Sequence, residues 1–162
     1  MNDKTNMVLD ILADNARFTV EQIADMTGMA APEVAAEIDR LQASGIIKGY
    51  KAIIDWEKTG RPVCSARIEL KVTPKSGMGF EEIAETIAQF DEVETVYLMS
   101  GGYDLALTVS AKTFKDVAMF VSHRLAPLPS VQSTATHFVL RKYKERGIIA
   151  SEDTGDMRED IG

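Results

Sequence analysis

The feature that most constrains this chain is a change in the spacing of its apolar residues near Gly60. Before this point, apolar residues recur every three or four positions, which is the spacing of amphipathic helices. After it, apolar and charged residues alternate from Ala66 to Val72, as in a half-buried strand. The pattern predicts a small helical domain followed by a domain built on a sheet. A chain of 162 residues is long enough for both.

Three short helices are predicted in the first part of the chain. The first covers Lys4–Ala13, where apolar residues share one face. The second begins after Thr19, because Thr19 and Gln22 match a capping box, in which two side chains satisfy unpaired backbone donors. Gly28 breaks the chain, and a third helix runs from a proline in its first turn, Pro32, until Gly45.

A short helix, a glycine turn and a longer helix indicate a helix-turn-helix, which places its last helix in the major groove of DNA. The same pattern also fits an ordinary three-helix bundle. Residues Ile46–Ile54 are predicted to form a short hairpin or an extended wing, and Asp55–Gly60 a polar linker. We therefore assign residues 1–60 to a winged helix-turn-helix domain that includes the wing and the linker.

The second domain, residues 61–150, is predicted to follow the order βαββαβ. Its strands are expected at Ala66–Val72, Val96–Met99, Tyr103–Val109 and Val131–Leu140, and its helices at Phe80–Phe90 and Phe114–Leu125. This order is typical of the ferredoxin-like α+β fold, an antiparallel sheet with two helices on one face. The other face would stay uncovered in so small a domain, and we expect a homodimer to cover it.

Charge and composition set limits on location and partners. The net charge is −7, and residues 1–60 carry six basic and ten acidic side chains, which opposes contact with phosphates. The segment 151–162 has five acids and one arginine and is predicted to be a disordered tail. We expect a cytoplasmic protein with no membrane span, since there is neither a signal peptide nor a long apolar run. The single cysteine, Cys64, is expected to be a small core residue.

Five segments, taken in order, resemble the Lrp/AsnC family of transcription regulators from about Lys4 to Gly147. They are Leu12–Arg17, Gly45–Tyr50, Ser100–Leu105, Thr134–Leu140 and Lys142–Lys144, the last two expected to close the sheet. The resemblance implies a winged helix-turn-helix that binds double-stranded DNA and a ligand-responsive domain. It also implies dimers that assemble into tetramers or octamers, and a small effector, commonly an amino acid. No cofactor, metal or catalytic residue is implied.

The resemblance also implies two groups of site residues. DNA contacts are expected from the helix-turn-helix and wing, at Thr19, Ala31, Pro32, Glu33, Ala36, Arg40, Lys48, Tyr50 and Lys51. Effector contacts are expected near a glycine-containing turn, at Met99, Ser100, Gly101, Gly102, Tyr103, Asp104, Thr134 and Thr136. Glycines expose backbone N–H groups to a carboxylate, and an aspartate can hold an ammonium group. In the alternative interpretation, Gly101 and Gly102 only form the turn and Asp104 only caps backbone groups.

The recognition helix departs from the family pattern. Many members carry a serine cap and an arginine where this chain has Ala30 and Glu37. The helix also holds Glu33 and Asp39 against a single base, Arg40. We therefore expect phosphate attraction to come from Lys48, Tyr50 and Lys51, with Lys58 and Arg61 beyond them, multiplied over several subunits.

Two other functions fit parts of the sequence. A sensor that has lost DNA binding would explain the acidic third helix, but not the retention of a capped helix-turn-helix with a basic wing. The sirohaem decarboxylases resemble this two-domain layout and are expected to use histidine and arginine around a tetrapyrrole. Here only His123 and His137 are available, and there is no Walker loop, GxSxG motif or metal-spaced set of Cys and His residues.

The acidic recognition helix leads to a prediction about assembly. A single dimer should bind DNA weakly, because it offers few cations, and larger assemblies should bind much more tightly. A gel-shift titration that compares protein held as a single dimer with the fully assembled protein measures this. Tight binding by the single dimer would contradict it.

Overall fold

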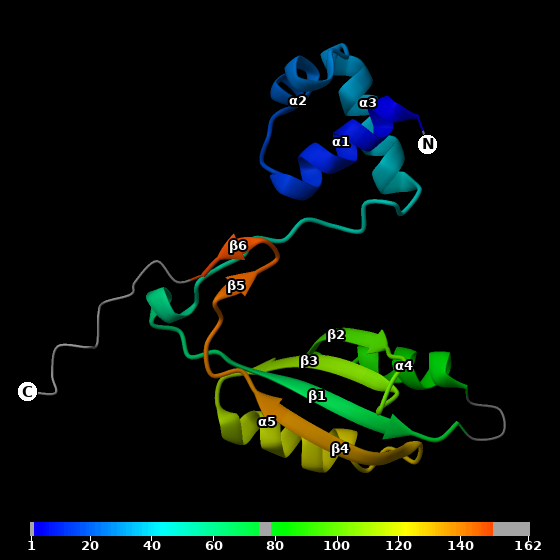
Figure 1. Ribbon diagram of the computed structural model, residues 1–162, viewed down its shortest axis with the longest axis vertical. Coiled ribbons are helices and arrows are strands. Elements are labelled where there is room, and N and C mark those ends of the chain that lie inside the picture. The colour runs from blue at the N-terminus through cyan, green and yellow to red at the C-terminus, as the bar shows by residue number, and fades with distance from the viewer. Residues whose placement is uncertain (1, 75–78, 151–162) are drawn as a thin grey trace, which may run out of the picture. The chain divides into compact units, whose positions relative to one another are not determined.

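The computed structural model describes residues 2–74 and 79–150, and the chain divides into two compact units, Met1–Ile53 and Ile54–Gly162 (Figure 1). This division precedes the predicted boundary at residue 60. The predicted tail at 151–162 lies outside the described residues. The first unit consists of the three predicted helices, α1 (Asp3–Asp14), α2 (Val20–Thr27) and α3 (Ala31–Ala43).

Local signals set the ends of these helices. The predicted capping box is present at α2: Thr19 Oγ1 accepts from Gln22 N at 3.2 Å, and Gln22 Oε1 accepts from Thr19 N at 2.9 Å. Gly28 ends α2 in the left-handed conformation, with φ of 65°. Gly45, at φ of 72°, ends α3, and the next amide, that of Ile46, donates back to the Leu41 carbonyl at 3.0 Å. This bonding pattern is a Schellman motif.

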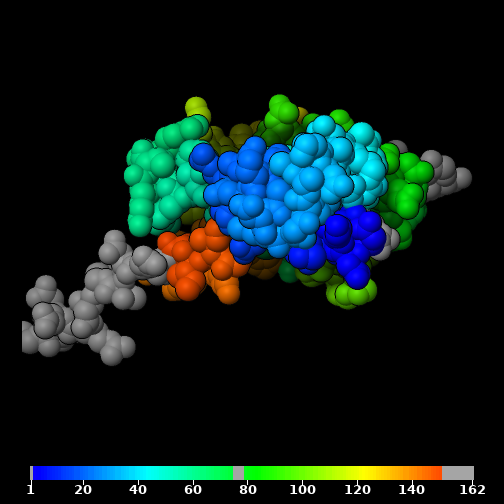
Figure 2. Space-filling model, turned by 90° about the horizontal axis from the view of Figure 1, so that it is seen from above, coloured from blue at the N-terminus to red at the C-terminus, as the bar shows by residue number. Residues whose placement is uncertain are grey.

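The first unit has a small apolar core to which all three helices contribute. Its fully buried side chains are Val8 from α1, Ile23 from α2, and Val34 and Leu41 from α3. In the space-filling view the side chains of this unit, coloured blue to cyan, fill the gaps seen between the ribbons (Figure 2). Burial of these few side chains therefore sets the packing of α3 against α1 and α2.

A polar contact also joins the first and third helices. Thr5, buried on α1, donates its hydroxyl to Glu37 Oε1 on α3 at 2.5 Å. Glu37 in turn accepts two hydrogen bonds from Arg40, at 2.8 Å from Nε and 2.7 Å from Nη2. These bonds, first that from Arg40 and then that from Thr5, lower the pKa of Glu37 from 4.5 to about 2.

The predicted hairpin after α3 is absent. The structure assigns no strand to the described residues between α3 and the short 3₁₀ turn η1 (Glu57–Thr59), so the alternative of an extended segment holds. The amides of Ile46 and Ile47 both donate to the Leu41 carbonyl at the end of α3. Because these donors are already used, the segment continues away from the helix and cannot start a hairpin ladder at this point.

The second unit has the predicted βαββαβ order. Its main elements are β1 (Cys64–Val72), α4 (Phe80–Ala88), β2 (Val93–Leu98), β3 (Leu105–Ala111), α5 (Phe114–Phe120), which continues as a π-helical turn η2 (Val121–Leu125), and β4 (Val131–Phe138). All strand pairs are antiparallel, in the order β2-β3-β1-β4 (Figure 1). The fold class is thus confirmed, while residues 75–78, between β1 and α4, lie outside the described residues.

One sheet face holds the core of this unit. Alternate side chains of β1 and β3, such as Ile68 and Leu107, are buried against Ile87 of α4 and against Val117 and Leu125 of the α5–η2 segment. The other face carries the side chains that alternate with these buried residues along each strand. It presents Ser65, Arg67, Glu69, Lys71, Tyr97, Ala106, Thr108, Ser110, Ala135 and His137. Tyr97 is 52% exposed there, and no helix among the described residues of this unit covers this face.

The end of the chain differs from the prediction for Lys142–Lys144. The sheet ends at Phe138, and Leu140 beyond it is 86% exposed. A separate hairpin forms instead from β5 (Lys144–Glu145) and β6 (Ile148–Ile149). Arg146 and Gly147 connect these strands with φ of 45° and 88°, the two positive angles of a two-residue hairpin turn. The turn thus directs Lys144 to β6 instead of the main sheet.

The hydrogen bonds that Glu37 accepts, first from Arg40 and then from Thr5, predict a pH dependence of stability. The pKa of Glu37 is lowered in the folded state, so its contribution is fully present above about pH 4.5 and is lost as the pH falls to about 2. Urea unfolding of the wild type and of Glu37→Gln should therefore show a stability difference that shrinks across this interval. A constant difference down to pH 2 would show that the hydrogen bonds do not favour the carboxylate.

Candidate functional site

The outward face of α3 carries three of the predicted DNA-binding residues. Val34 and Leu41 are buried in the core, whereas Pro32, Ala36 and Arg40 are exposed on the opposite side. Ala36 and Arg40 are four residues apart and therefore share one helix face. This geometry lets α3 approach DNA closely over its small residues, with Arg40 as its one cationic side chain.

The other predicted DNA-binding residues fall into two groups. Thr19, Ala31 and Glu33 lie at helix starts, and both Thr19 and Glu33 are used as caps, Glu33 Oε2 accepting from Ala30 N at 3.2 Å. Lys48, Tyr50 and Lys51 are exposed on the extended segment after α3. This segment leaves both lysines free of ion pairs with any described residue.

Sequence reasoning did not assign a site role to Thr5 or Glu37. Thr5 lies three residues before Val8, on the buried side of α1, where a hydroxyl needs a hydrogen-bond partner. That polar residue on an apolar face was the available signal. Its partner, Glu37, is 32 residues away and is not indicated by local spacing.

The predicted effector loop joins β2 to β3 and is held against the end of β1. Asp104 N donates to the Leu70 carbonyl at 2.9 Å, and Asp104 Oδ2 accepts from Val72 N at 2.8 Å. Met99 N donates to the Asp104 carbonyl at 2.8 Å. Asp104 therefore does cap a backbone group, as one of the two interpretations required, and in doing so it fixes the base of the loop.

The tip of this loop is open. Ser100, Gly101 and Gly102 are exposed, and Gly101 has φ of 151°. A Cβ atom built on either glycine would meet no atom within 4 Å. The backbone of both glycines is therefore accessible to a small molecule, and Tyr103 is half-buried beside them.

Thr134 and Thr136 lie on the other side of β1 from this loop. Thr134 pairs with Leu70 and Thr136 with Ile68, so both threonines are on the helix-covered face of β4. Both are half-buried. Thr134 thus borders the same end of β1 as Asp104, while Thr136 lies nearer the middle of the strand.

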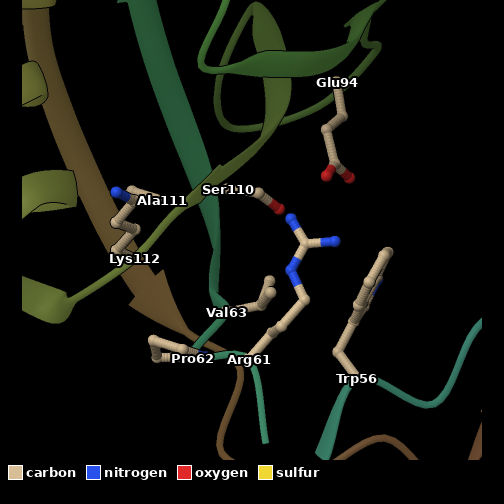
Figure 3. Close-up of a pocket in the computed structure, with 8 residues that line it drawn as sticks. All are labelled: Trp56, Arg61, Pro62, Val63, Glu94, Ser110, Ala111 and Lys112. Atoms are coloured by element: carbon tan, nitrogen blue, oxygen red, sulfur yellow. The ribbon is translucent and has the colours of Figure 1, made fainter. Parts of the chain in front are cut away.

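A hollow lies at the end of β3 opposite to the loop of residues 99–104. It measures about 360 Å³, and its lining residues are Trp56, Arg61, Pro62, Val63, Glu94, Ser110, Ala111 and Lys112. The Arg61 guanidinium carbon lies 4.9 Å from the Trp56 ring centroid, and the Glu94 carboxylate points toward Arg61 (Figure 3). Arg61 is thus held by an aromatic ring of its own unit. Lys58, also named as a cation beyond the wing, lies 3.9 Å from Asp55.

The histidines and the cysteine do not form a reactive site. His137 is on the uncovered sheet face, with Nε2 3.7 Å from Glu69 Oε1, whereas His123 is exposed on η2, on the helix side. Cys64 is buried, and burial together with Asp116 raises its thiol pKa, which keeps it protonated. Within residues 2–74 and 79–150 no group of His, Cys, Asp and Glu side chains is placed to hold a metal.

No helix in the described part of the chain is long and apolar enough to cross a membrane.

Two family models match this chain and together span most of it. The Lrp/AsnC ligand binding domain matches residues 65–149, and a winged helix-turn-helix DNA-binding domain matches residues 1–48. The chain is 47% identical to the HTH-type transcriptional regulator YugG of Bacillus subtilis, over 98% of this chain and 96% of that protein. It is 29% identical to the regulatory protein AsnC of Haemophilus influenzae, over 80% and 84% of the two chains.

The fold also matches a solved regulator. The transcriptional regulator NMB0573 of Neisseria meningitidis, in complex with L-Met, superposes with a TM-score of 0.72 at 20% identity. The match covers 90% of this chain and 93% of that one. With the helix-turn-helix of the first unit and the βαββαβ sheet of the second, these matches show that the chain belongs to the Lrp/AsnC family and is a DNA-binding transcription regulator, not an enzyme.

Proposed function

We propose that this regulator binds DNA as an assembly of homodimers in the cytoplasm and that an amino acid, bound at the loop of residues 99–104, changes its assembly and its DNA affinity. The observation that carries the proposal is the construction of this loop. Its base is fixed by the two hydrogen bonds of Asp104 to β1, while the glycines at its tip have an open backbone. A rigid base with accessible donors is what a small zwitterion requires.

The chemistry of the loop complements both ends of an amino acid. The N–H groups of Gly101 and Gly102 can donate to its carboxylate. Asp104 uses Oδ2 for Val72, which leaves Oδ1 to accept from its ammonium group. The solved complex of the Neisseria regulator with L-Met supports an effector of this class.

The uncovered sheet face supports the homodimer. It presents small and polar side chains, among them Ala106 and Thr108, around the exposed ring of Tyr97. Two such faces can pack closely because their central residues are small. A dimer brings two recognition helices to one DNA, which raises the affinity that each acidic helix-turn-helix alone lacks.

The first prediction from this proposal concerns DNA binding. Fluorescence anisotropy on the DNA upstream of the chain's own gene should show binding that weakens as salt rises, because the release of counterions from the DNA favours binding less at high salt concentration. One member of a pool of amino acids should shift the affinity. If the folded protein binds DNA with an affinity that no amino acid alters, the proposal that the effector is an amino acid is wrong. The proposal that the protein binds this DNA would still stand.

The second prediction separates the loop from the hollow at Arg61. Asp104→Asn keeps the backbone contact to Val72 but removes the charge, and should weaken amino-acid binding about tenfold or more. Arg61→Ala, in the hollow, should leave the affinity within about twofold. Isothermal titration calorimetry with the amino acid identified above measures both. The reverse pattern would place the effector in the hollow.

A further inference from the structure

The only basic residue of α3 is held by its neighbour in a defined orientation. Arg40 Nε and Nη2 lie 2.8 and 2.7 Å from the two carboxylate oxygens of Glu37, a bidentate pair. Glu37 is 17% exposed at its side chain, whereas Arg40 is 53% exposed. The carboxylate thus sits toward the protein, and the guanidinium extends outward from it.

The rigidity of this pair comes from a third residue. Thr5 of α1 donates its hydroxyl to Glu37 Oε1 at 2.5 Å and is itself buried. Glu37 is therefore fixed from a different helix as well as by Arg40. A surface pair on one helix would lose most of its order to side-chain entropy, but this carboxylate is anchored in the domain.

The pairing leaves one edge of the guanidinium free. Arginine has five N–H donors, and Glu37 uses one on Nε and one on Nη2. Three donors remain, two on Nη1 and one on Nη2, and they form the end of the planar fork. Two parallel donors of this kind match the O6 and N7 acceptors of guanine in the major groove.

We propose that Arg40 reads a guanine through its free Nη1–Nη2 edge, and that Glu37 and Thr5 are positioning residues that hold it for this contact. Ala36, one turn before Arg40, is small and exposed, so the helix can approach the base edges at this point. The charges of Arg40 and Glu37 cancel locally. The pair therefore contributes base discrimination without adding phosphate attraction, which explains an acid in a helix that binds DNA.

The experiment uses the full-length chain and two DNA probes. The first is the tightest duplex that the wild type selects from a random-sequence library, with each G·C pair replaced in turn by A·T. The second is a random duplex of the same length. The variants are Arg40→Ala, Glu37→Gln and Thr5→Val. The matched control is Asp39→Asn, which removes an exposed carboxylate of the same helix that forms no hydrogen bond or ion pair with a described residue.

Arg40→Ala should identify the guanine. In the wild type, replacing this base pair should weaken binding roughly 5- to 150-fold, and in Arg40→Ala the replacement should have no effect. In Glu37→Gln and Thr5→Val, the fold-loss of affinity caused by the same base-pair replacement should be less than about a third of the fold-loss in the wild type. Penalties at all other positions should be unchanged.

Binding to the random duplex separates positioning from charge. Glu37→Gln and Asp39→Asn both remove one negative charge, so both should bind it more tightly than the wild type, to a similar degree. Thr5→Val leaves the charge unchanged and should bind it within about twofold of the wild type, which also shows that the variant is folded.

Three results would overturn the proposal. One is a wild type that selects no sequence, and another is an Arg40→Ala variant that loses discrimination at no guanine. The third is a Glu37→Gln variant that, like Asp39→Asn, keeps the full penalty at the Arg40 guanine. None of these results depends on the effector loop.

Discussion

The alternation of apolar and polar side chains along β1 is the constraint on which most of this structure depends. β1 pairs with both β3 and β4, so its buried residues, Ile68 and Leu70 among them, set which face of three strands the helices cover. The same alternation leaves Arg67 and Glu69 on the other face, which no helix among the described residues of this unit covers. This open face is the surface on which we propose that a second copy of the domain packs as a further layer.

β1 also links this core to the loop of residues 99–104, where we propose that the effector binds. The strand ends at Val72, and its last residues give Asp104 both a carbonyl and an N–H group to bind. The loop that joins β2 to β3 is thus hydrogen-bonded to β1, which is neither of the strands that it connects. A ligand at this loop would contact a segment that is hydrogen-bonded to β1, so that the loop and the end of this central strand respond together.

The parts of the fold that were predicted from the sequence are those with local causes. The capping box at Thr19 and the glycine end of α3 each involve residues within a few positions, and the βαββαβ order follows from periodicity. Contacts of long range were not predictable: Thr5 with Glu37 and Asp104 with Val72 each join residues 32 positions apart. The short hairpin at Arg146 and Gly147 was missed because its strands have two residues each, too few to show a period.

The net charge of the chain makes the contacts of Glu37 important for DNA binding. With a net charge of −7, this protein cannot rely on general attraction to phosphates, and the exposed cations of its first unit are few. An acidic residue on the recognition helix would weaken binding further if it acted only through its charge. Glu37 is instead paired, anchored to α1 and directed away from the solvent, so its charge is balanced by Arg40 before DNA arrives. For such a protein we expect weak non-specific binding, so that the proposed base contact of Arg40, repeated over the subunits of an assembly, separates an operator from the rest of the genome.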